Sequence, residues 1–338
     1  RDCLLSRGLG DVYKRQFLDS IVNQTIGTDN IELILIDDSS TDNTPEIIRE
    51  YEQIYPDMIL AIFNEVNIKQ GTCRNIALDN YVSGEYFCFI DSDDAVPPYY
   101  LEYLYNTARL NNADVIQLKS SSDTNDIAVS PAMLTYDTFI CDTTDKRKDF
   151  LLNPAIMTES CLCKFINKNY YDHYHFHFAE GVAYEEPLFT HPIKHTAKII
   201  CRINEPIYYY RINPNGTMQE YMQRYDTICQ HMLVQLETYN YVKEHLDIDT
   251  FLYEMQLYFV HTFFYETIIF LNARQMPLTA ELVRYMCSIT KQIIPDIMSN
   301  PYLGKEGTYE HREVADYIDS YNHNGNISVL INKLKELK

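Results

Sequence analysis

A short apolar run that ends in a cluster of carboxylates, Tyr86–Asp94 (YFCFIDSDD), constrains the fold of this chain most strongly. The run Tyr86–Ile90 has the length of one buried strand, and Pro97 and Pro98 prevent a strand from continuing far beyond it. Three carboxylates within four residues repel one another unless a hard cation lies between them. The pattern therefore predicts either a ligand site at the end of a strand or a solvated acidic turn.

Apolar runs of strand length alternate with amphipathic helical stretches around this feature. The expected strands are Ile31–Ile36, Met58–Phe63, Tyr86–Ile90 and Asp114–Leu118, and the expected helices are Pro45–Ile54, Gly71–Tyr81 and Pro98–Asn111. This order predicts an α/β domain with a mostly parallel sheet flanked by helices. Two of the strands end in acidic residues, at Asp37-Asp38 and at Asp91. Parallel strands would bring both acidic ends to one edge of the sheet.

Three regions of different character follow one another along the chain. Residues 1–16 show no clear period and do not form an apolar strand, so we interpret them as a non-native leader, with a divergent amino terminus as the alternative. Residues 17–216 hold the α/β pattern. Residues 217–338 carry long amphipathic stretches with methionines and aromatic residues at helical spacing, which predict a helical carboxy-terminal region.

The composition of the chain limits the kinds of partner and the cellular location that we expect. The formal net charge of -20 repels a phosphate backbone, so we expect no nucleic-acid partner. Nine cysteines without the spacing of a metal site predict reduced thiols and a cytoplasmic protein. No apolar run reaches the roughly 20 residues that cross a bilayer, so we expect at most peripheral association with the inner face of a membrane.

Two further groups have both a structural and a functional interpretation. Glu185-Glu186 is either a carboxylate pair stabilised by the start of a helix or a general base, because crowding raises the pKa of one carboxyl in such a pair. Arg74 either lies on a capped surface helix or supplies positive charge to the acidic edge, as a nucleotide ligand would require.

Six motifs, taken together and in order, resemble an inverting family 2 glycosyltransferase with the GT-A fold. They are Ile34–Asp42 (ILIDDSSTD), Gly71–Asn75 (GTCRN), Phe89–Asp94 (FIDSDD), Cys163–Phe165 (CKF), Tyr184–Phe189 (YEEPLF) and Tyr208–Arg211 (YYYR). The resemblance covers about residues 17–217 and leaves out the helical carboxy-terminal region.

The resemblance implies a role for each matching residue. Nucleotide-sugar binding falls to Asp37, Asp38, Asp42, Arg74, Asp91 and Asp93, with Asp38 at the base and Asp91 at the ribose. Within the D-x-D motif, Asp93 together with Asp91 would hold Mn²⁺ or Mg²⁺. Glu186 would be the catalytic base, with Glu185 as the next choice.

The implied reaction is metal-dependent transfer of a sugar, with inversion, from a nucleotide-diphosphate donor to a glycan or lipid-linked acceptor in polysaccharide or surface glycan synthesis. Two positions depart from the family pattern. The family opens with an apolar strand and a Tyr-Asn turn, which residues 1–16 do not match, and Glu186 stands where the family more often has Asp. The first departure favours an alternative, a catalytically impaired nucleotide-binding or interaction protein. A different metal-dependent phosphoryl-group enzyme would also fit an acidic edge.

Overall fold

The computed structural model describes residues 10–212, 224–303, 309–321 and 327–335. The chain divides into two compact units, Arg1–Tyr221 and Met222–Lys338, and each is described by itself. The expected domain boundary between residues 216 and 217 lies outside the described residues.

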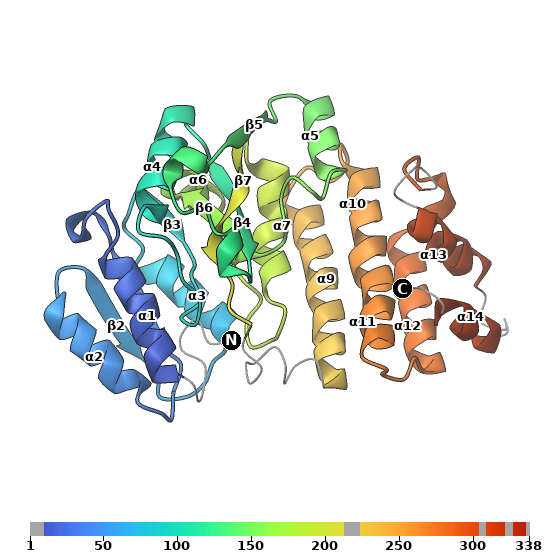
Figure 1. Ribbon diagram of the computed structural model, residues 1–338. Helices are drawn as coiled ribbons and strands as arrows, with labels where there is room; N and C mark the ends of the chain where they lie inside the picture. Colours follow the sequence, from blue (N-terminus) through green and yellow to red (C-terminus); the bar gives the residue numbers. More distant parts are fainter. Residues whose placement is uncertain (1–9, 213–223, 304–308, 322–326, 336–338) are drawn as a thin grey trace. The chain divides into compact units, whose positions relative to one another are not determined.

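The first unit alternates strands and helices along most of its length (Figure 1). In chain order its elements are α1 (Gly10–Val22), β1 (Leu33–Asp37), α2 (Thr44–Ile54), β2 (Ile59–Phe63), α3 (Gln70–Asn80), β3 (Tyr86–Cys88), α4 (Tyr100–Asn111), β4 (Val115–Ser121), β5 (Tyr136–Ile140), α5 (Thr144–Leu151), β6 (Lys164–Asn167), α6 (Lys168–Tyr174), α7 (Glu186–Thr196) and β7 (Ile199–Tyr209). Short 3₁₀ turns lie at Thr28–Asn30, Thr124–Asp126, Pro131–Met133 and Cys161–Cys163. All four strands and all three helices expected around the acidic run are present.

The strands form two sheets. β1 and β2 form a parallel pair, and five strands form a mixed sheet in the order β3-β6-β4-β7-β5. In the mixed sheet only β4 and β7 are parallel, whereas β6 runs antiparallel to both β3 and β4. The expected mostly parallel sheet is therefore wrong. The reason is that β6 lies between β3 and β4, which the simple alternation of strands and helices would have placed side by side or nearly so.

The expected boundary at residue 16 is wrong, because helix α1 runs across it from Gly10 to Val22. The buried Lys14 amine donates to Asp42 Oδ2 at 2.8 Å and also to the Thr44 hydroxyl, at the start of α2. Arg15 forms a two-point ion pair with Glu50 of α2. Polar contacts of this kind give no apolar period, which is why the sequence pattern did not include these residues in the fold.

The stretch His173–Phe178 alternates polar and aromatic residues, as a half-buried strand would, but it does not form a strand. Its first residues end helix α6, and His175 then takes a left-handed conformation with φ of 52°. Phe176 and Phe178 are nonetheless buried, so the alternation reflects burial in a segment outside any sheet.

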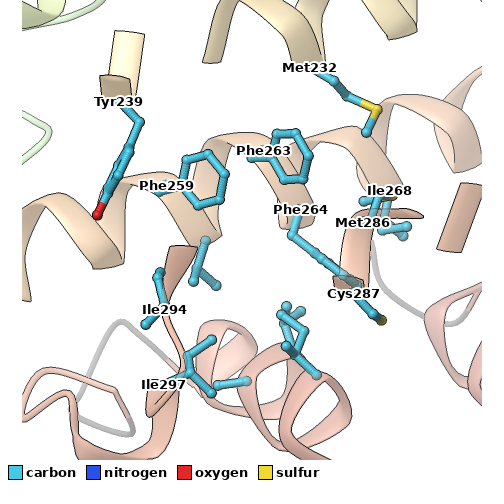
Figure 2. Close-up of a cluster of buried hydrophobic side chains, with 14 of the residues drawn as sticks. Met232, Tyr239, Phe259, Phe263, Phe264, Ile268, Met286, Cys287, Ile294 and Ile297 are labelled. Atoms are coloured by element: carbon cyan, nitrogen blue, oxygen red, sulfur yellow. The ribbon is translucent and has the colours of Figure 1, made fainter. Parts of the chain in front are cut away.

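The second unit is helical, as expected. Its helices are α9 (Tyr225–His245), α10 (Leu252–Phe259), a π-helical segment (Val260–Glu266), α11 (Thr267–Ala273), α12 (Ala280–Ile293), a 3₁₀ turn (Ile297–Ser299), α13 (Tyr309–Ser320) and α14 (Ile327–Leu334). Figure 2 shows the core of this unit, in which Phe259, Phe263 and Phe264 pack among Met286 and Ile294. Among the described residues, no helix combines the length and apolar character that a membrane span requires.

Candidate active site

The acidic run after β3 forms a buried cluster. Carboxylate oxygens of Asp91, Asp93 and Asp94 all lie within 4.8 Å of one another, and all three residues are buried. Burial, and then the nearby Asp91 carboxylate, raise the pKa of Asp94 to about 8. Tyr208 donates its hydroxyl to Asp94 Oδ2 at 2.5 Å, and the Arg211 backbone N–H donates to Asp94 Oδ1 at 2.8 Å. The protein itself therefore holds both oxygens of Asp94.

These carboxylates suit a hard divalent cation. Such cations take oxygen ligands, and a positive charge would relieve the repulsion between these carboxylates. Because Asp94 is already held by Tyr208 and Arg211, Asp91 and Asp93 are the residues that would bind the ion. The sequence reasoning named these two and gave no role to Asp94.

Arg74, on α3, connects the acidic cluster with the start of α7. Its Nη1 lies 2.5 Å from Glu185 Oε1 and its Nη2 lies 3.4 Å from Asp91 Oδ1. The Arg74 side chain is 3% exposed, and the guanidinium lies over the rings of Phe89 and Phe178. The interpretation of Arg74 as a residue of a surface helix is therefore wrong. One buried cation links two parts of the chain that the sequence predicted to act together.

The two glutamates at the start of α7 have different surroundings. Glu185 is 1% exposed and is paired with Arg74, while its Oε2 has no hydrogen-bond partner. Glu186 is half-buried, and its Oε1 accepts a hydrogen bond of 2.9 Å from the Cys161 backbone N–H. Enclosure, and then the charge of Glu185, raise the pKa of Glu186 above its usual value, although Arg74 and the Cys161 bond oppose this. A carboxylate with a raised pKa is suited to take a proton near neutral pH.

A glycine allows the close approach between α3 and the loop before α7. A Cβ added at Gly71 would lie 2.3 Å from the Ala179 carbonyl oxygen and 2.9 Å from Glu185 Cγ. The loop also contains Tyr184 with φ of 62°, a conformation that is strained for a residue with a side chain. The site thus depends on a tight contact at one position and on strained backbone at another.

The two acidic residues at the carboxyl end of β1, Asp37 and Asp38, differ in their hydrogen bonds. Asp38 accepts hydrogen bonds from the backbone N–H groups of Ile68 and Lys69, each at 2.9 Å, and so holds the loop before α3. Asp37 Oδ2 accepts a hydrogen bond from the Ser40 N–H, whereas Asp37 Oδ1 is buried without a hydrogen-bond partner. Asp37 is therefore better placed than Asp38 to accept a hydrogen bond from a ligand.

Asp42 lies at the start of α2 and is engaged there. Thr44 donates its backbone N–H to Asp42 Oδ1 at 3.1 Å, and Lys14 binds the other oxygen. Burial raises the pKa of Asp42, but the bonds from Lys14 and Thr44 outweigh it and hold the pKa below its usual value. The nucleotide role implied for Asp42 and Asp38 remains a prediction.

Residues outside the predicted set support the site. Lys164 is fully buried and donates to the carbonyl oxygens of Thr158 and Ser160, at 2.7 and 2.8 Å, which fixes the loop that leads to Cys161. Burial lowers the pKa of Lys164 to about 8. The Arg211 side chain donates to the Asp93 carbonyl oxygen at 2.7 Å. Lys164 and Arg211 both belong to motifs of the sequence, but no sequence pattern indicates supporting contacts of this kind.

Comparison with known proteins gives a consistent result. The family model described as glycosyl transferase family 2 matches residues 13–174, which include β1, α3 and the acidic cluster but not Glu185 or Glu186. The chain is similar to the structure of S. aureus TarS 1-349 in complex with UDP-GlcNAc, with a TM-score of 0.56 and 19% identity over 84% of this chain and 86% of that chain. This likeness shows that the two share the GT-A fold.

The chain spans less than two thirds of the length of the named relatives that it matches. Poly(ribitol-phosphate) beta-glucosyltransferase of Bacillus spizizenii is 29% identical over 199 residues, which are 59% of this chain and 30% of that protein. The putative glycosyltransferase EpsH of Bacillus subtilis is 26% identical over 221 residues, which are 63% of this chain and 61% of that protein.

Proposed function

Because residues 13–174 match the family model described as glycosyl transferase family 2, we propose that this protein transfers a sugar from a nucleotide-diphosphate donor to an acceptor hydroxyl, with inversion and with the help of a divalent cation. One observation carries the proposal. Arg74 contacts Asp91 on one side and Glu185 on the other, so the acidic cluster and the glutamate pair share a single buried cation.

The donor would bind along the acidic cluster. Asp91 and Asp93 would hold Mn²⁺ or Mg²⁺, which would offset the negative charge of the departing diphosphate. A net charge of -20 supports a role for such an ion, because an anionic donor is otherwise repelled. The buried and unpartnered Asp37 Oδ1 supports a hydrogen bond from the donor at the end of β1.

Glu186 would act as the base. It takes the proton of the acceptor hydroxyl, the acceptor oxygen attacks the anomeric carbon opposite the leaving diphosphate, and the configuration inverts. The raised pKa of Glu186, caused by its enclosure and by Glu185, supports this role over Glu185. Glu185 instead neutralises Arg74 and holds it in place.

The donor and acceptor classes are drawn from the relatives. The UDP-GlcNAc complex of TarS supports a UDP-sugar as donor, and the name of the Bacillus spizizenii relative supports a polyol-phosphate or related surface polymer as acceptor. We therefore propose that the chain acts in the synthesis of a surface glycan such as a teichoic acid.

The test is sugar transfer by the full chain, measured with a panel of UDP-sugars in the presence of Mn²⁺ or Mg²⁺. We expect Glu186→Gln to lower kcat by roughly 10²–10⁴-fold while donor affinity is kept. Glu46→Gln is the matched control, since Glu46 is exposed in the first turn of α2, and should leave the rate unchanged. A Glu186→Gln variant with full activity would refute the assignment of the base. Donor binding without any turnover in the unmodified chain would favour the catalytically impaired alternative.

A further inference from the structure

Lys164, the first residue of β6, is a buried lysine whose ammonium group has three hydrogen-bond acceptors. β6 lies between β3 and β4 in the five-stranded sheet, and the Lys164 side chain is 0% exposed. Its ammonium donates to the carbonyl oxygens of Thr158 and Ser160, at 2.7 and 2.8 Å, and to Gln117 Oε1 at 3.4 Å. A side chain enclosed in this way cannot contact a substrate, so any part that it has in the reaction is indirect.

These acceptors of Lys164 are neutral oxygens and not carboxylates. A buried charge is costly, and apolar side chains of similar volume often replace buried charged groups without loss of stability. The stability of the sheet alone therefore does not explain an ammonium group at this position. What the ammonium group adds is a fixed place for the two main-chain carbonyls on either side of Glu159.

One of these two carbonyls belongs to the peptide group that holds Glu186. The Ser160 carbonyl oxygen and the Cys161 N–H are the two ends of one planar unit. Lys164 binds the oxygen end at 2.8 Å, and the N–H end donates to Glu186 Oε1 at 2.9 Å. Because the unit is planar and rigid, fixing its oxygen also fixes the direction in which its N–H points. A cation on the oxygen also polarises the unit and strengthens the hydrogen bond that its N–H donates.

The same loop, residues 158–161, is joined to α7 a second time. Glu159 accepts a hydrogen bond of 2.8 Å from the Thr190 hydroxyl and forms an ion pair with Lys194, and both partners lie on α7. The loop and α7 are therefore held together, and Lys164 connects them to the sheet. With Oε1 of Glu186 held by the loop, the direction of Oε2 is fixed as well.

We propose that Lys164 is a positioning residue for Glu186: through the Ser160–Cys161 peptide group it holds Oε1, so that Oε2 faces the acceptor hydroxyl and takes its proton. This inference rests on the proposed function, which gives Glu186 its role as base. The acceptor O–H bond breaks and its proton moves to Oε2, while the acceptor oxygen forms the new bond to the anomeric carbon. The bond to the diphosphate breaks, and its electron pair leaves with the diphosphate. Lys164 neither gives nor takes a proton.

The first experiment compares Lys164→Met with the unmodified full chain, without any sugar nucleotide. Met has a similar length but donates no hydrogen bond. We expect the Cys161 amide to exchange its hydrogen faster in Lys164→Met, because the peptide group loses the contact that orients it. We also expect the pKa of Glu186, followed by NMR of its isotope-labelled carboxyl carbon, to rise, because the bond from Cys161 lowers it. Lys146→Met, at an exposed lysine of α5, is the matched control and should change neither value.

A second variant removes only the last link, because Lys164→Met leaves buried carbonyls without a donor and can disrupt the loop. Cys161→Pro deletes the N–H that Glu186 accepts. Ser160 has φ of -71° and ψ of 126°, which suits the residue before a proline, and Cys161 opens a 3₁₀ turn. Cys161→Ala removes the thiol but keeps the N–H. We expect the pKa of Glu186 to rise more in Cys161→Pro than in Cys161→Ala.

Sugar transfer gives the third readout. We expect Lys164→Met and Cys161→Pro each to lower kcat by roughly 10–10²-fold, the cost of a slightly misplaced catalytic group, with the KM for the donor unchanged. Unchanged kcat in both variants, or a change in KM alone, would overturn the proposal.

The measurements without substrate separate this proposal from the proposed function. A pKa of Glu186 that rises in Lys164→Met but not in Cys161→Pro would mean that the lysine acts by its charge and not through the peptide group, and would overturn the proposal. Absence of sugar transfer by the unmodified chain would count against the proposed function. A raised pKa of Glu186 in both variants would still support the link from Lys164 to Glu186, and an unchanged pKa in both would refute it.

Discussion

Replacing Arg74 by Gln should destabilise the first unit strongly, because it removes the cation that two buried carboxylates share. Arg74, Glu185 and Asp91 are each 1–3% exposed, and Arg74 lies 2.5 Å and 3.4 Å from its two partners. Breaking a buried ion pair by removing one partner costs about 3–5 kcal/mol, since it leaves a charge buried without compensation. We expect Arg74→Gln to lower the free energy of unfolding of the first unit by about this amount.

The assay is native-state hydrogen exchange of α3 and β3 amides, because a chain with two compact units need not unfold in one step. The matched control is Arg109→Gln, whose ion pair with Glu85 is exposed and should contribute about 0–1 kcal/mol. The double variant Arg74→Gln/Glu185→Gln should be more stable than Arg74→Gln alone, because one orphaned charge is removed. A loss below about 1 kcal/mol for Arg74→Gln, or a double variant less stable than the single one, would refute this reasoning.

Two other predictions concern pH and packing. Burial, and then the charge of Asp91, raise the pKa of Asp94 in the folded state to about 8, whereas the ordinary pKa of an aspartate is 3.8. Between these two values the folded state holds a proton on Asp94 that the unfolded state has released. The stability of the metal-free protein should therefore fall as pH rises from about 4 to about 8, and Asp94→Asn should reduce this dependence in urea unfolding curves; an unchanged dependence would contradict the raised pKa. Gly71→Ala should destabilise the first unit by about 1–3 kcal/mol, because the new Cβ would fall 2.3 Å from the Ala179 carbonyl oxygen, and a variant as stable as the parent in the same assay would show that the backbone there moves freely.

The local features of the fold were predictable because each has a short-range signal. The apolar runs that become β1 and β3 end in acidic residues in both the sequence and the structure. The start of α7 at Glu186 was also predictable, because Pro187 suits the first turn of a helix. The second unit followed from its helical spacing of aromatic and methionine residues.

Contacts between distant parts of the chain were not predictable in the same way. Arg74 and Glu185 are 111 residues apart, and no local pattern identifies them as partners. The sheet proved mixed because β6 inserts between β3 and β4, a pairing that depends on the whole domain. Helix α1 was misjudged because its packing rests partly on Lys14, a buried charge that hydrophobic periodicity counts as polar.

The most direct test of the central claim is calorimetric titration of the full chain with a panel of nucleotide-diphosphate sugars, with Mn²⁺ and then with a chelator. We expect one donor to bind with the metal and to lose at least tenfold in affinity without it. We also expect Asp93→Asn to remove this dependence on metal together with tight binding. Equal affinity with the metal and with the chelator would contradict a donor site built on Asp91 and Asp93 around a divalent ion.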